Sequence, residues 1–197
     1  MLDYGSGNLH SVSRALAHVG ADVTVTSQAA QVARADALVI PGVGHFGACM
    51  RALAGAGLDA AIKDFVGTGQ PVFGVCLGMQ VLFQSSEEDG ASGLGILPGS
   101  VRKLPDTVRV PHMGWNTVVW SAPHPYAAGV DPGAWFYFVH SFAPEVGGAT
   151  VGVGEHGRPF AAAVARNNVF ATQFHPEKSG QAGLELYANF VREVEAA

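Results

Sequence analysis

The sequence is poor in charge and has no long apolar run. Charged residues make up 14% of the 197 residues, and the formal net charge is −5. The chain has no basic run interleaved with aromatic residues, which argues against nucleic acid as a ligand. No apolar stretch approaches the ~20 residues of a membrane-spanning helix. Nothing near Met1 resembles a secretory signal, so we expect a cytoplasmic protein.

Cysteine is also scarce. Only Cys49 and Cys76 are present, and two thiols do not make a disulfide framework. The sequence has no Cys-x-x-Cys or His-x-x-x-His pair, so we expect neither a metal site nor a cofactor. Hydrophobic residues make up 48% of the chain, enough for one buried core. No linker or repeat divides the sequence, and we expect one domain over residues 1–197.

Strand-like and helix-like patterns alternate along the first half of the chain, and strand-like patterns dominate the second. The predicted strands are 21–25, 37–40, 71–75, 116–120, 134–139, 149–153, 160–165 and 169–174. The predicted helices are 11–19, 58–66, 78–83 and 182–194. This order predicts an α/β fold in which helices flank a mostly parallel central sheet with additional antiparallel strands. Active sites of such sheets lie beyond the carboxyl ends of the strands.

One motif at a strand end is typical of a nucleophile. Residues 74–80, Gly-Val-Cys-Leu-Gly-Met-Gln, follow a predicted buried strand and open a helix, which is the layout of a nucleophile elbow. The helix N-terminus favours the thiolate of Cys76, and the N–H of Leu77 can donate to a developing oxyanion. The alternative is a structural buried cysteine, the interpretation we give Cys49 between Ala48 and Met50.

A thiol nucleophile needs an imidazole, and the imidazole needs an acid to orient it. The predicted strand 169–174 delivers His175 to its end, where Pro176 stiffens the turn and Glu177 follows. Taken alone, this pair could also be incidental in a surface loop. His140 is the rival base, but it has no acid close by in sequence; we expect it to shape the site or to be a buried structural histidine.

Two of these phrases resemble the class I, or triad, glutamine amidotransferases: residues 74–80 and Phe-His-Pro-Glu-Lys-Ser at 174–179. Further phrases are similar to one family within that class, the glutaminase subunits of imidazole glycerol phosphate synthase in histidine biosynthesis. They are Asp-Tyr-Gly-Ser-Gly-Asn at 3–8, Pro-Gly-Val-Gly-His-Phe-Gly at 41–47, Pro-His-Met-Gly-Trp-Asn at 111–116 and Tyr-Phe-Val-His-Ser at 137–141. The resemblance covers essentially the whole chain and implies a flavodoxin-like fold.

The resemblance also implies roles for individual residues. Cys76 would attack the side-chain amide of glutamine, His175 would carry the proton and Glu177 would orient His175, and the glutamyl thioester would then be hydrolysed. The oxyanion hole would be formed by Val43, Gly44 and Leu77. The glutamine would be held by Gly42, Gly78, Gln80, Ser141 and Phe142.

The partner that the resemblance implies is a (β/α)8-barrel cyclase subunit in a heterodimer. Ammonia would pass to it and react there to give imidazole glycerol phosphate and aminoimidazole carboxamide ribotide. The residues expected toward this partner are Asn8, His112, Met113, Trp115 and Lys178.

The sequence departs from the family pattern at its start. Only Met1 and Leu2 precede Asp3, where the family usually carries several apolar residues. We expect either a shortened first strand or a start that lies upstream.

Three other functions are compatible with parts of the pattern. A glutaminase that feeds a different synthase would share the triad, although the phrase at 111–116 argues against it. A stand-alone cysteine hydrolase would need an open cleft for its substrate. A catalytically inactive binding module is disfavoured by the complete triad.

Overall fold

The computed structural model describes every residue of the chain except 6, 122 and 197. Its centre is a six-stranded sheet with the order β1-β2-β11-β10-β9-β6. Its parallel half consists of β1 (Leu38–Ile40), β2 (Val72–Val75) and β11 (Val169–Thr172). The antiparallel half consists of β10 (Pro159–Arg166), β9 (Thr150–Glu155) and β6 (Val119–Trp120). The three parallel strands are buried along their length, which is why they read as continuous apolar runs.

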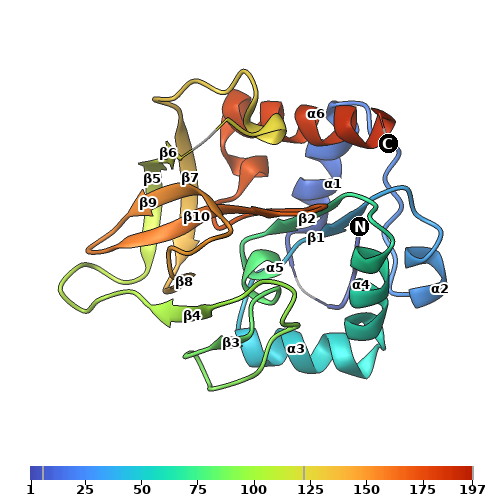
Figure 1. Cartoon of the computed structure of the whole chain (residues 1–197), viewed down its shortest axis with the longest axis horizontal. Coiled ribbons are helices and arrows are strands. Elements are labelled where there is room, and N and C mark those ends of the chain that lie inside the picture. The colour runs from blue at the N-terminus through green and yellow to red at the C-terminus, as the bar shows by residue number, and fades with distance from the viewer. Residues whose placement is uncertain (6, 122, 197) are drawn as a thin grey trace.

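Helices cover the two faces of this sheet (Figure 1). One face carries α1 (Leu9–His18) and α6 (Gly180–Ala196), and the other carries α3 (Phe46–Gly55) and α4 (Leu58–Gly67). The short α2 (Ala29–Val32) precedes β1 in the chain. Two apolar clusters fill the spaces between the layers. The layered α/β arrangement with antiparallel additions is the one expected from the sequence.

Two small sheets extend the central one on the side of its antiparallel strands (Figure 1). The first is β3 (Ser85–Ser86), β4 (Ser100–Lys103) and β8 (Phe142–Pro144). The second is the antiparallel pair of β5 (His112–Thr117) and β7 (Trp135–His140). The 3-10 turn η1 (Pro125–Ala127) lies between β6 and β7 in the chain, and η2 (Pro176–Lys178) follows β11.

Two of the predicted strands differ from the structure, and α2, α3, β3, β4 and β8 lie outside every predicted range. The range 116–120 is divided between β5 and β6, with Val118 buried at the break. The range 21–25 belongs to no strand; the nearest pairing in the described part of the chain is the parallel bridge between Leu2 and Thr26. A strand requires a neighbour of similar length, and Met1 and Leu2 offer only two residues.

Leu2 nevertheless occupies a strand position. Its N–H donates to the carbonyl of Val39 at 3.0 Å, and its side chain is completely buried. On the other side, Thr26 donates to the carbonyl of Met1 at 3.0 Å. A groove of about 530 Å³ lies beside this point, lined by residues that include Met1, Val23 and Val39. Ser6, within the phrase at 3–8, lies outside the described residues.

Candidate active site

Cys76 lies where β2 ends and α5 (Leu77–Gln80) begins. Its backbone has φ 52° and ψ −107°, at a positive φ that non-glycine residues rarely adopt. Such strain persists only when the surroundings impose it. Here the N–H of Cys76 donates to the carbonyl of Thr172 at 2.7 Å. A Cβ at Gly78 would lie 1.8 Å from the carbonyl oxygen of Ile40. The elbow therefore forms because glycine lets α5 press against β1.

His175 follows β11 and donates through Nδ1 to Oε1 of Glu177 at 2.6 Å. The donor must be Nδ1, because the carboxylate can only accept. Both side chains are buried, with 1% and 0% exposed. The other ring nitrogen, Nε2, is buried and makes no well-formed hydrogen bond to any described residue. It is the nitrogen left to exchange a proton with a reacting group.

Charge around His175 favours the imidazolium. Burial lowers its pKa, but the neighbouring Cys76 sulfur and the Glu177 carboxylate outweigh burial and raise the pKa of His175 to about 10. An imidazolium beside a thiol stabilises the thiolate. The predicted triad residues Cys76, His175 and Glu177 are therefore brought together from two strand ends, and they can act as nucleophile, base and orienting acid.

Two further residues hold the carboxylate of Glu177. Asn8 donates through Nδ2 to Oε1 of Glu177 at 2.5 Å, and the hydroxyl of Tyr187 donates to Oε2 at 3.4 Å. Asn8 is predicted from the sequence to lie toward a partner; in the structure its amide binds Glu177. Tyr187 lies within the predicted helix 182–194, and a helical pattern gives no signal for a role of its hydroxyl.

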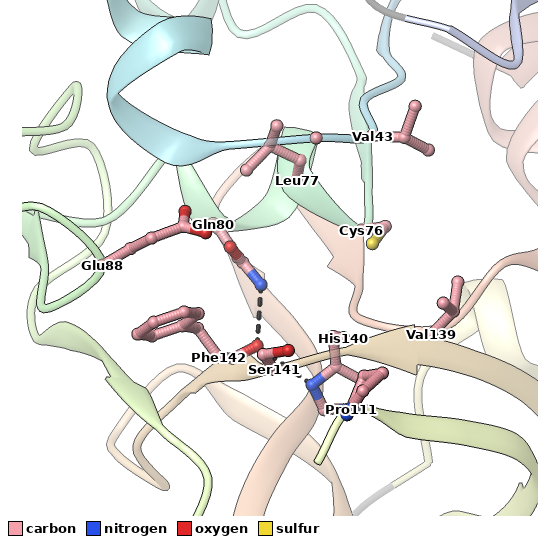
Figure 2. Close-up of a pocket in the computed structure, with 11 residues that line it drawn as sticks. Val43, Cys76, Leu77, Gln80, Glu88, Pro111, Val139, His140, Ser141 and Phe142 are labelled. Carbon is pink, nitrogen blue, oxygen red and sulfur yellow. Dashed lines mark hydrogen bonds between the residues drawn. The ribbon is translucent and has the colours of Figure 1, made fainter.

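A cavity of about 250 Å³ opens beside Cys76 (Figure 2). Gln80 lines it and donates through Nε2 to the carbonyl of Phe142 at 2.9 Å and to Oε1 of Gln173 at 3.0 Å. Gln173 in turn donates to the sulfur of Cys76 at 3.6 Å. The lining residues are Val43, Gly44, Cys76, Leu77, Gln80, Glu88, Pro111, Val139, His140, Ser141 and Phe142. Of the residues predicted to bind substrate, Gln80, Ser141 and Phe142 line this cavity.

The other two predicted substrate residues, Gly42 and Gly78, shape the wall from behind. A Cβ at Gly42 would lie 2.5 Å from the hydroxyl oxygen of Tyr4 and 3.0 Å from the backbone nitrogen of Gly78. The two glycines thus allow the 41–44 segment to lie directly on α5.

The N–H of Leu77, a predicted oxyanion donor, is already hydrogen-bonded in this conformation. It donates to the carbonyl of Gly42 at 3.3 Å. Val43 and Gly44 line the same side of the cavity, and Gly44 has φ +110°, a conformation that favours glycine. The predicted oxyanion residues therefore lie at one place, but the N–H of Leu77 is hydrogen-bonded to the carbonyl oxygen of Gly42.

Sequence reasoning missed two polar residues of the site. Gln173 is predicted only as part of a strand, and it touches the nucleophile because β11 lies beside β2. Glu88 is a cavity-lining carboxylate whose Oε2 accepts the N–H of Phe46 at 2.6 Å. It follows β3 and has no motif of its own. Within the described residues, no group of three or more His, Cys, Asp or Glu could hold a metal ion.

The residues predicted to face a partner separate into an exposed and a buried set. Met113 and Trp115 are 63% and 53% exposed on one face of β5. Trp135, 58% exposed, lies opposite Thr117 on the same face of this two-stranded sheet, and the sequence did not single it out. Lys178 is exposed, with its Nζ 5.7 Å above the ring of Tyr137. His112 differs from the prediction, because its side chain is buried against His140.

His140 and Cys49 occupy the places that the sequence suggested. His140 is buried and lines the cavity. Cys49 is buried in α3. Burial raises the pKa of its thiol to about 11, although a hydrogen bond with Tyr4 lowers that pKa in part. Among the described residues, no helix is long and apolar enough to cross a membrane.

Comparison with known proteins agrees with this geometry. The model of the family described as glutamine amidotransferase class-I matches residues 1–194. The imidazole glycerol phosphate synthase subunit HisH of Acinetobacter baylyi is 46% identical, over 97% of this chain and 96% of the relative. The protein of the same name from Moorella thermoacetica is 45% identical, over 96% and 92%.

Solved structures share the fold at lower identity. A crystal structure of a glutamine amidotransferase superposes with a TM-score of 0.77 at 18% identity, covering 98% of this chain and 97% of that one. The structure of PurLQS from Thermotoga maritima gives a TM-score of 0.71 at 19% identity, covering 98% of this chain and 96% of the matched chain.

Proposed function

This chain belongs to the class-I glutamine amidotransferase family, and we propose that it hydrolyses glutamine to glutamate and ammonia in the cavity beside Cys76. Its relatives are 45–46% identical along nearly their whole length, and they support its function as the glutaminase subunit of imidazole glycerol phosphate synthase. The observation that carries the chemistry is the buried arrangement of Cys76, His175 and Glu177 beside a cavity of about 250 Å³.

The proposed reaction has two halves. The thiolate of Cys76 attacks the side-chain amide carbon of glutamine, and the carbon–nitrogen bond breaks as His175 gives its Nε2 proton to the departing ammonia. This leaves a glutamyl thioester and a neutral imidazole. His175 then takes one proton from water as the resulting hydroxide attacks the thioester, the carbon–sulfur bond breaks, and glutamate leaves with its second proton released to solvent, which restores the thiolate and the imidazolium. Glu177 holds the imidazole with Nε2 toward the reacting atoms throughout.

The size and lining of the cavity fit a free amino acid. A volume of about 250 Å³ suits one small molecule and leaves little room for an extended chain, which favours a glutaminase over a peptidase. Glu88 supplies a carboxylate for the α-ammonium group of glutamine, and the Ser141–Phe142 backbone supplies polar groups on the opposite wall. Gln80 and its neighbours fix that wall.

The conformation of residues 42–44 implies control of this reaction. The Leu77 N–H cannot stabilise an oxyanion while it donates to the carbonyl of Gly42. We expect a rearrangement of the 42–44 backbone, permitted by its glycines, to release this donor and to bring a second N–H toward the cavity. Loss of one such donor typically costs ~10²–10³ in rate, so the resting enzyme should be slow.

The proposed switch is the partner. A (β/α)8-barrel cyclase subunit would dock on the exposed face of β5 and β7 and near Lys178, and it would receive the ammonia away from bulk water. There the ammonia would complete the synthesis of imidazole glycerol phosphate and release aminoimidazole carboxamide ribotide.

The test measures glutamate release by three preparations. They are the chain alone, its complex with the cyclase subunit, and that complex with the nucleotide ligand of the cyclase bound. We expect slow turnover that rises by two orders of magnitude or more in the ligand-bound complex, and none for Cys76→Ser. Equal, full activity in all three preparations would favour a stand-alone amidohydrolase. Glutamate release by Cys76→Ser at the wild-type rate would refute the site itself.

A further inference from the structure

Two buried histidines beside the cavity take no part in the proposed reaction. His112 on β5 and His140 on β7 lie opposite each other in the strand register, with Nδ1 of His112 3.0 Å from Nε2 of His140. Both are buried, at 5% and 6% exposed. His140 also lies 2.9 Å from the carbonyl oxygen of Phe142 through Nδ1, and its side chain lines the cavity (Figure 2).

The contacts determine where each proton lies. The Phe142 carbonyl can only accept, so Nδ1 of His140 carries a proton and Nε2 of a neutral His140 is an acceptor. His112 must then donate from Nδ1, which leaves its own Nε2 as an acceptor. That nitrogen has a donor within reach, because the amide nitrogen of Asn116 lies 3.4 Å away. The three hydrogen bonds therefore run in one direction, from Asn116 to Phe142.

This chain of bonds ends on the wall of the substrate cavity. The Phe142 carbonyl accepts from His140 on one side and from Gln80 on the other. The preceding carbonyl, that of Ser141, accepts the N–H of Leu104 at 2.9 Å. Gln80 is itself linked through Gln173 to the sulfur of Cys76. The Phe142 carbonyl thus accepts hydrogen bonds both from the histidine pair and from Gln80, whose amide leads through Gln173 to Cys76.

We propose that His140, oriented by His112, is a positioning residue that fixes the Ser141–Phe142 segment for glutamine binding. The proposal rests on the proposed function, since it assigns a role to the wall of that cavity. Neither histidine touches the reacting atoms; each acts through the Phe142 carbonyl. The pair also joins β5, whose outer face carries Met113 and Trp115, to the substrate cavity.

The surroundings keep both rings neutral, as the arrangement requires. His112 is stacked between the rings of Phe138 and His156, and the ring of Phe160 packs edge-on against both His112 and His140. A proton on Nε2 of His140 would face the Nδ1 proton of His112. Burial lowers the pKa of His140 to about 3 and that of His112 to about 4, in each case helped by a neighbouring histidine.

The first test needs no activity. Long-range ¹H–¹⁵N NMR of the wild-type chain at pH 7 reports the tautomer of each histidine. We expect the Nδ1–H tautomer for His112 and His140. We expect an Nε2 proton on His156, whose Nε2 lies 2.8 Å from the Arg109 carbonyl. An Nε2–H tautomer or a charged ring at His140 would overturn the proposal, whether or not the protein hydrolyses glutamine.

The second test separates binding from chemistry in the complex with the cyclase subunit. His140→Leu removes the hydrogen bond to the Phe142 carbonyl and the one from His112, so KM for glutamine should rise about 3- to 10-fold with kcat changed less than twofold. His140→Asn keeps a donor near the Nδ1 position and should recover most of the loss. His112→Leu should raise KM similarly, and the double Leu variant no further than either single one.

The matched control is His124→Leu, which replaces a half-buried histidine in the turn before β7 that does not line the cavity. It should leave KM unchanged. The proposal fails if His140→Leu and His124→Leu give the same KM, or if His140→Leu lowers kcat alone. Complete loss of turnover in the wild type would instead count against the proposed function, and the NMR result would still stand.

Discussion

Histidines in this chain have opposite protonation behaviour because they face different partners. His175 lies against a carboxylate and a thiol, and its pKa is raised to about 10 despite burial. His112 and His140 lie against each other and against aromatic rings, and their pKa values are lowered to about 4 and about 3. One residue type therefore supplies a charged candidate catalytic group and a neutral pair beside the same cavity.

The neutral pair predicts acid sensitivity of the fold. Unfolded histidines take up protons below about pH 6.5, whereas folded His112 and His140 resist protonation until about pH 4 and below. The unfolded state therefore binds more protons between these limits, and the free energy of unfolding falls as pH falls, by up to roughly 2.7 kcal/mol per pH unit for two protons. Urea denaturation between pH 4 and 7 measures this slope. In the variant with His112→Leu and His140→Leu, the free energy of unfolding should depend less steeply on pH. An unchanged slope would contradict the assignment of both histidines as neutral in the folded state.

At the residue scale, the sequence predicted the parts of the site that are local. Cys76, and His175 with Glu177, stand in short phrases that fix a turn, so their geometry follows from neighbouring residues. Asn8 and Gln173 could not be assigned in this way. Each touches the triad only because a distant segment is packed beside it: Asn8 is 169 positions from Glu177, and Gln173 is 97 positions from Cys76.

At the scale of elements, the elbow depends on the absence of one side chain. A Cβ at Gly78 would lie 1.8 Å from backbone oxygen of β1, which cannot move as a flexible side chain can. Gly78→Ala should therefore cost several kcal/mol of stability, or displace α5 and abolish glutamine hydrolysis. Gly55→Ala is the control, because its Cβ meets no atom within 4 Å at the end of α3, and it should be neutral or slightly stabilising. Thermal unfolding of the two variants decides; equal melting temperatures would show that the elbow tolerates a side chain.

A second prediction concerns the groove of about 530 Å³ beside Met1. Residues placed ahead of Met1 would continue the line of Leu2 between the 21–25 segment and β1. Four added apolar residues such as Val and Ile should complete that strand, which normally needs about five residues, and should raise the melting temperature by several degrees. Four added Gly and Ser residues are the matched control. If both extensions leave the melting temperature unchanged, Met1 and Leu2 alone are enough to fill this strand position.

The element boundaries show why pattern reading succeeded in one place and failed in another. The strands β2 and β11 are buried on both faces, so apolar runs located them to within two residues at each end. The run 21–25 has the same apolar character but no neighbouring strand to pair with along its length among the described residues. Apolar pattern predicts burial, whereas strand pairing depends on what tertiary structure places alongside.

At the scale of the whole molecule, the exposed face of β5 and β7 should bind the cyclase subunit. Met113, Trp115 and Trp135 form this face, and large aromatic residues often dominate binding energy. Trp115→Ala should weaken the complex by about 10-fold or more, measured by titration calorimetry. Val146→Ala removes an exposed apolar side chain after β8 and should leave affinity unchanged. Equal affinities for both variants would place the interface elsewhere.

The fold class and the family could be predicted from the sequence because the motifs at the strand ends agree with one architecture. The hydrogen bond that occupies the Leu77 N–H could not be predicted, since the residues at 42–44 do not determine which way their backbone faces. Only the structure places the Gly42 carbonyl on the Leu77 N–H.

The most direct measurement of the central claim is covalent labelling with an electrophilic glutamine analogue, followed by peptide mass spectrometry. The chain offers two buried thiols, and burial keeps Cys49 protonated with a pKa of about 11. We predict one label per chain, on Cys76, suppressed by excess glutamine and at least tenfold slower in His175→Ala. Labelling of Cys49 with Cys76 unmodified, or labelling of Cys76 that glutamine does not slow, would contradict a glutaminase site at this elbow.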